Sequence, residues 1–239
     1  ESGSASKLQN DSHHHPFHIQ LFFIVIQLKN LVYVKKVRFS VLYLNYKSTK
    51  KQSEKIITLI PGSRMSEVKR LLPLMRDVID MLTRNGYMGY QFVMPTVETT
   101  EQYIRQEISH WRVKPVLVPS KQRYDVYAKT YIAIAASGTV TAELAMLHVP
   151  TIVVYKMNPI TVWIGRTKWV SLVNILLKRS VYPEFLGGAA TPENIINAVQ
   201  QLTIPAKRDK MIADLKSADN LWRKSDGVPA QLIADGIRK

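Results

Sequence analysis

The stretch Ile56–Glu67 reads IITLIPGSRMSE, and the fold is best inferred from it. Four of its first five residues are apolar, as in a buried strand, and a Pro-Gly-Ser-Arg turn follows before a run with helical spacing. This order predicts a strand, a tight loop and then a helix. Gly62 lets the backbone approach a ligand closely, and the amino end of the helix favours an anion at the same place.

A second stretch repeats this order. Pro-Gly-Ser-Arg alone suits an ordinary turn, although Arg64 adds a planar, permanently charged fork that matches phosphate. Tyr131–Glu143 reads YIAIAASGTVTAE, which is again a strand, a small polar loop and a helix, about 75 residues further on. In a parallel sheet all such loops emerge at the carboxyl edge of the strands. We therefore expect both loops to line one anion-binding crevice.

The residues of both loops are the candidate ligands of a nucleoside diphosphate. Glu143 lies one turn into the second helix, where a carboxylate accepts hydrogen bonds from a ribose. The alternative for Glu143 is a first-turn carboxylate that complements the helix dipole. The candidate diphosphate ligands are Gly62, Ser63 and Arg64 in the first loop, and Ser137, Gly138 and Thr139 in the second, with the hydroxyl of Thr141 beside them.

From residue 56 onward, strand and helix patterns alternate. Short apolar or β-branched runs predict strands at 56–60, 90–94, 115–118, 131–135 and 151–155. Helical spacing and cap residues predict helices at 66–84, 98–110, 121–129, 138–147, 192–202 and 206–222. Strands that alternate with helices are typical of an α/β fold with a doubly wound parallel sheet, covered by helices on both faces.

Charge and composition narrow the classes of partner. The chain has 33 Lys and Arg against 18 Asp and Glu, a net charge of +15, and no cysteine. The excess favours anionic partners, namely phosphorylated substrates or an anionic lipid surface. Zinc-finger spacing and RNP-like aromatic motifs are missing, so we do not predict nucleic-acid binding. Without cysteine, disulfides and thiolate metal sites are excluded.

Residues 1–54 differ from the rest of the chain. Their consecutive histidines at 13–15 are interpreted as a solvated tail rather than a metal site, and we predict no functional metal. The apolar stretch 17–34 contains an uninterrupted apolar core of six residues, well below the roughly 20 that span a bilayer. We expect an atypical extension over 1–54, partly disordered or packed on a single domain at 55–239. Alternatively, its apolar and basic residues lie on an anionic membrane.

Three ordered blocks resemble the lipid-A-disaccharide synthases. They are LIPGSRMSEV at 59–68, AASGTVTAELAMLHVPTIVVYKMNP at 135–159, and WVSLVNILLKRSVYPEFLGG at 169–188. The order and separations match the carboxyl-terminal half of that family, over roughly residues 55–238. The resemblance implies a Rossmann-like domain that forms the donor-binding half of a GT-B fold.

The resemblance also implies a reaction and its partners. The family transfers 2,3-diacylglucosamine from its UDP donor to 2,3-diacylglucosamine 1-phosphate, which forms the lipid A disaccharide and UDP. It implies no cofactor and no metal, and a peripheral location on the cytoplasmic face of the inner membrane. Within the third block, Asn174 and Glu184 are the candidate contacts to the donor sugar, although a turn cap and a surface charge are the plainer alternatives. Lys156 either meets a phosphate or is solvated.

The sequence departs from the family pattern in two ways. Val173 stands where the family usually has proline, and Gly187 where it usually has glutamine, which removes one expected donor contact. The larger departure is the amino-terminal domain, which supplies the acceptor pocket and general base and for which 1–54 is too short. No catalytic residue is therefore assigned, and a separate amino-terminal half is an expected partner. The alternatives are a UDP-N-acetylglucosamine epimerase, a peptidoglycan glycosyltransferase, or a non-catalytic membrane-surface module.

Overall fold

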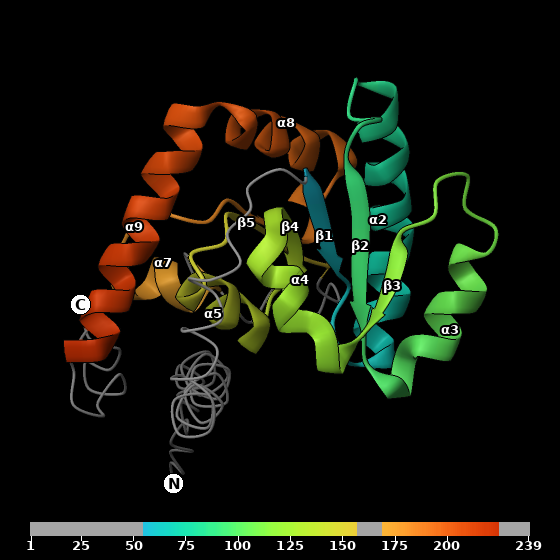
Figure 1. Ribbon diagram of the computed structural model, residues 1–239, viewed down its shortest axis with the longest axis horizontal. Coiled ribbons are helices and arrows are strands. Elements are labelled where there is room, and N and C mark those ends of the chain that lie inside the picture. Colours follow the sequence, from blue (N-terminus) through green and yellow to red (C-terminus); the bar gives the residue numbers. More distant parts are fainter. Residues whose placement is uncertain (1–54, 157–168, 225–239) are drawn as a thin grey trace, which may run out of the picture.

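The computed structural model describes residues 55–156 and 169–224 (Figure 1). The predictions made for 1–54, including the histidine tail and the apolar stretches, lie outside the described residues. Within the described part, helices alternate with the strands of one six-stranded sheet. None of these described helices has both the length and the apolar character that crossing a membrane requires.

The sheet has the order β3-β2-β1-β4-β5-β6, and each neighbouring pair is parallel. This arrangement confirms the prediction of a doubly wound, Rossmann-like parallel sheet. The chain moves outward from β1 to β3, returns to place β4 on the other side of β1, and then continues outward to β6. The strands are β1 (Ile56–Ile60), β2 (Gln91–Thr96), β3 (Val116–Pro119), β4 (Thr130–Ala136), β5 (Thr151–Tyr155) and β6 (Glu184–Leu186).

The predicted helices are confirmed to within two residues at nearly every boundary. Thr191 caps α8 by accepting a hydrogen bond from the amide of Asn194 at 3.3 Å, as its Thr-Pro-Glu start predicts. Asn85 ends α2, as its Asn-Gly sequence predicts. The helices are α2 (Met65–Arg84), α3 (Glu98–Ile108), α4 (Arg123–Lys129), α5 (Thr139–Met146), α7 (Leu172–Leu177), α8 (Pro192–Thr203) and α9 (Pro205–Lys224), with 3₁₀ turns at Ser120–Gln122 and Gly187–Ala189.

Side chains of the central strands alternate between two apolar layers. On β4, Ile132 and Ile134 join the larger core with α2 and α8, whereas Ala133 and Ala135 face the smaller layer with α4 and α5. In Figure 1 α4 crosses in front of the sheet and α2 lies behind it. Both faces are therefore covered, which explains why the central strands are nearly continuous apolar runs rather than alternating ones.

The sequence pattern did not predict β6 and α7. β6 has three residues, and it pairs with β5 through the register Val153↔Glu184. α7 has six residues and buries Leu172, Val173 and Asn174. Elements this short carry too few positions for an apolar period to be recognised.

Candidate functional site

The two predicted loops leave neighbouring strands. β1 and β4 pair in parallel, with Leu59 opposite Ile134 and Ile60 opposite Ala135, so residues 61–64 and 137–138 emerge side by side at one edge of the sheet. This is also the point where the strand order reverses. Ligands of open parallel sheets bind in the crevice outside the carboxyl ends of the strands at such a point. The topology thus brings together the two loops that the sequence singled out.

In the first loop, the backbone conformation requires glycine. Gly62 has φ +107°, and a Cβ at this position would lie 2.6 Å from Glu67 Oε2 and 3.0 Å from Glu67 Cβ. Arg64 precedes the first residue of α2, and its Nη1 lies 3.2 Å from Glu67 Oε1. The Arg64 side chain is 65% exposed. Because an ion pair this exposed contributes little, the guanidinium is available to an incoming anion.

The amino end of α2 supplies backbone donors at the same place. The amides of Glu67 and Val68 both donate to Arg64 O at 3.0 Å, which begins the helical pattern. The amides of Met65 and Ser66 belong to the first turn, where a helix has no acceptor of its own to offer. With the positive end of the helix dipole, these donors and Arg64 favour an anion above the loop.

The second loop offers two hydroxyls rather than the three that were predicted. Ser137 and Thr139 are partly exposed on either side of Gly138, which caps α5. Thr141, however, is 1% exposed, and its hydroxyl donates to Gly138 O at 2.7 Å. Thr141 therefore stabilises the first turn of α5, and the prediction that its hydroxyl serves a phosphate is wrong.

Glu143 lies beside a cation that the sequence did not single out. Its carboxylate is 14% exposed, and its Oε2 lies 3.4 Å from Arg123 Nε. Burial raises the pKa of Glu143 above its ordinary value, while Arg123 and a hydrogen bond with Tyr124 act in the opposite direction. No local spacing links residues 123 and 143, because α4 and α5 are separated by β4. The predicted ribose ligand is thus held by α4.

Asn174 and Glu184 form a hydrogen-bonded unit beside β6. Asn174 is 0% exposed; its Oδ1 accepts from the amides of Val181 and Tyr182, and its Nδ2 donates to Tyr182 O and Glu184 Oε1, all at 2.7–2.9 Å. Such burial leaves no atom of Asn174 exposed to a sugar, and its side chain instead holds the backbone of Val181 and Tyr182 and the carboxylate of Glu184.

Glu184 is not a loose surface charge. Its carboxylate accepts from the amides of Val170 and Ser171 at 2.8 and 2.9 Å, and from the hydroxyl of Ser171 at 2.5 Å. It therefore ties the segment before α7 to β6. β5 lies between β6 and β4, so this unit is set apart from the two loops. Lys156 follows β5 at the carboxyl edge and is partly exposed.

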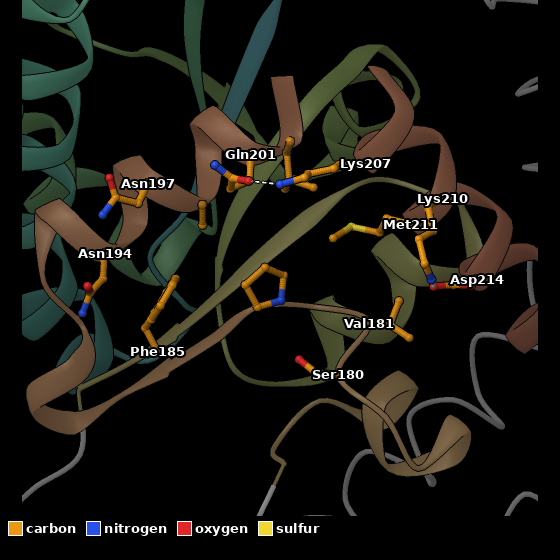
Figure 2. Close-up of a pocket in the computed structure, with 13 residues that line it drawn as sticks. Ser180, Val181, Phe185, Asn194, Asn197, Gln201, Lys207, Lys210, Met211 and Asp214 are labelled. Carbon is orange, nitrogen blue, oxygen red and sulfur yellow. Dashed lines mark hydrogen bonds and ion pairs between the residues drawn. The ribbon is translucent and has the colours of Figure 1, made fainter. Parts of the chain in front are cut away.

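A separate hollow of about 480 Å³ lies between α8, α9 and the segment before β6 (Figure 2). Its two lysines are paired within the chain, since Lys207 contacts Gln201 and Lys210 Nζ lies 3.2 Å from Asp214 Oδ2. The hollow adjoins the residues that precede β6, whereas the two loops follow the ends of β1 and β4. It is therefore not part of the site at the switch point.

Comparison with known proteins connects this geometry with one family. The family model for lipid-A-disaccharide synthetase matches residues 40–225. One similar relative is the lipid-A-disaccharide synthase of Paramagnetospirillum magneticum, which is 36% identical over 77% of this chain and 48% of the relative. Another is the lipid-A-disaccharide synthase of Gluconobacter oxydans, which is 38% identical over 62% of this chain and 36% of the relative. The solved structure of a spinosyn rhamnosyltransferase with thymidine diphosphate covers 69% of this chain and 42% of the rhamnosyltransferase chain. The sequence identity is 15% and the TM-score is 0.45. The chain spans about half the length of the Paramagnetospirillum magneticum relative and of the lipid-A-disaccharide synthase of Rhodospirillum centenum.

Proposed function

The chain belongs to the lipid-A-disaccharide synthetase family, and from that premise we propose that residues 55–239 are the UDP-sugar-binding half of a GT-B-fold glycosyltransferase. The reaction is transfer of 2,3-diacylglucosamine from UDP to 2,3-diacylglucosamine 1-phosphate, with release of UDP. One observation carries the proposal: the Pro-Gly-Ser-Arg and Ser-Gly-Thr loops follow neighbouring parallel strands at the switch point of the sheet.

The proposed roles follow from the chemistry of each loop. The diphosphate takes hydrogen bonds from the first-turn amides of α2 and from Arg64, with Gly62 and Ser63 forming the floor of the loop. Negative charge develops on the diphosphate as the sugar leaves, and donors fixed in advance stabilise that charge in the transition state. On the other side of the diphosphate lie the residues of the second loop, Ser137, Gly138 and Thr139. Glu143, within α5, receives the ribose.

The remaining partners are also part of the proposal. The chain matches 48% of the length of the Paramagnetospirillum magneticum relative. We place the acceptor pocket and the general base outside the matched part, so an amino-terminal half is a proposed partner. Donor and acceptor are both acylated in the proposed reaction, so the chain is expected to act at a membrane surface, and the family resemblance suggests the cytoplasmic face of the inner membrane. A net charge of +15 supports attraction to such an anionic surface.

Titration of the 239-residue chain with UDP tests the proposal directly. We expect saturable binding by calorimetry, and we expect Arg64→Ala to weaken it about tenfold or more, because a charge-assisted hydrogen bond to phosphate is lost. Arg76→Ala is the matched control, since Arg76 is an exposed arginine on the same helix that pairs with Asp77 at 2.9 Å. The proposal fails if the folded wild-type chain shows no saturable UDP binding.

A further inference from the structure

We propose that Arg123 is the positioning residue of the nucleotide site: it fixes the Glu143 carboxylate to receive the ribose hydroxyls, and so makes the site prefer a ribonucleotide to its 2′-deoxy form. The inference rests on the proposed UDP site and extends it to a residue on α4. The carrying observation is the contact between Arg123 and Glu143, beside the helix end that faces the proposed diphosphate.

The guanidinium of Arg123 is held by hydrogen bonds and by a ring contact within the chain. Nη1 donates to Ser120 O at 3.1 Å, and Nη2 donates to the Tyr124 hydroxyl at 2.9 Å. The guanidinium carbon also lies 4.3 Å from the centre of the Tyr124 ring. These contacts leave Nε directed at Glu143 Oε2, at 3.4 Å. Arg123 is 30% exposed, so it is a fixed element of the structure rather than a freely moving surface cation.

The place of Glu143 on α5 suits a ribose. Gly138 caps α5, and Glu143 follows little more than one turn later. One helical turn rises about 5.4 Å, which is the scale that separates the α-phosphate of a nucleotide from its ribose hydroxyls. A ligand whose diphosphate lies at the amino end of α5 thus brings its ribose towards the Glu143 carboxylate. The carboxylate accepts, and the 2′- and 3′-hydroxyls donate.

Acceptance of two hydroxyls is strongest when Glu143 is charged. Burial raises its pKa, and the positive charge of Arg123 opposes this effect. The other titratable groups that face the carboxylate are Tyr124 and Tyr127 of α4, and burial raises the pKa of both, so they remain neutral. Removing the guanidinium therefore loosens the carboxylate and favours its neutral form.

The test compares UDP with 2′-deoxy-UDP in the 239-residue chain. We expect the wild type to bind UDP about tenfold more tightly than 2′-deoxy-UDP, since one charge-assisted hydrogen bond is lost with the hydroxyl. In Arg123→Gln the ratio is expected to fall to about twofold or less, because UDP loses more affinity than 2′-deoxy-UDP, which has only the 3′-hydroxyl to donate to Glu143. Glu143→Gln is expected to reduce the ratio similarly, and adding Arg123→Gln to it should change the ratio no further.

Two further variants separate positioning from a merely structural role. Arg123→Lys keeps the charge but loses the planar fork, and we expect an intermediate ratio. If Arg123→Gln does not fold, Arg123→Lys replaces it as the test variant. Arg76 is an exposed arginine on α2 that contacts its neighbour Asp77. Arg76→Gln should leave the ratio of UDP affinity to 2′-deoxy-UDP affinity unchanged. A change in thermal stability of the Arg123 variants with an unaltered ratio would mean that Arg123 only ties α4 to α5, and would overturn the inference.

The pH profile gives an independent readout. Because the pKa of Glu143 is raised, the preference for UDP is expected to fall as the pH drops through that raised value, above the ordinary range of a carboxyl. Arg123→Gln should move this fall to higher pH, since only the hydrogen bond with Tyr124 then opposes the effect of burial, and Glu143→Gln should abolish it. An identical profile in wild type and Arg123→Gln contradicts the inference. Absence of any UDP binding in the wild type overturns the proposed function as well, so the two failures are distinguishable.

Discussion

Replacing Asn174 with alanine is expected to lower the free energy of unfolding by about 3–5 kcal/mol. The amide is fully buried and makes four hydrogen bonds, to the amides of Val181 and Tyr182, to Tyr182 O and to Glu184. Removing it leaves buried backbone groups without a partner, and each such group costs about 1–3 kcal/mol. Because the four groups relax together, their penalties do not add in full. Urea unfolding followed by circular dichroism measures the change.

Asn197→Ala provides the matched control. Asn197 is an exposed asparagine on α8 that lines the hollow, and a surface substitution of this kind is expected to stay within about 0.5 kcal/mol of wild type. A loss below about 1 kcal/mol for Asn174→Ala would contradict the buried network. It would return Asn174 to the role that the family resemblance suggested, a contact to the donor sugar.

Much of the fold followed from local sequence patterns. β1, β4 and β5 are nearly continuous apolar runs because helices cover both faces of the sheet, and runs of this kind are recognisable without any partner. Cap residues such as Thr191 and Asn85 fixed helix boundaries for the same local reason. The position of β4 beside β1 is a property of the whole chain, and no local pattern contains it.

The site was only partly predictable, and the reason is distance along the chain. Gly62 and Arg64 stand within three residues of one another, directly after a strand, so their common role is visible in the sequence. Arg123 lies on the helix before β4 in the sequence and Glu143 on the helix after it, so the two residues meet only after folding. Burial is equally invisible in a motif: Asn174 matches the family block, yet its side chain is enclosed and serves the backbone.

Gly62→Ala is expected to weaken UDP binding about a hundredfold or more while the chain stays folded. At φ +107° an added Cβ is strained by roughly 1–3 kcal/mol, and it would also lie 2.6 Å from Glu67 Oε2 and 3.0 Å from Glu67 Cβ. Glu67 must move, and it contacts Arg64 at 3.2 Å, so the proposed diphosphate ligands move with it. Loss of two charge-assisted hydrogen bonds corresponds to a change of about this size.

Gly86→Ala separates backbone strain from damage to the loop. Gly86 also has positive φ, +89°, but nothing lies within 4 Å of a Cβ added there, and it follows α2 at the opposite end from Arg64. We expect Gly86→Ala to reduce stability by about 1 kcal/mol and to leave UDP affinity unchanged. Calorimetry and thermal unfolding on both variants make the comparison. Equal affinity in Gly62→Ala and wild type would mean that the first loop does not approach the nucleotide, because a ligand cradled by that backbone has to respond when the backbone shifts.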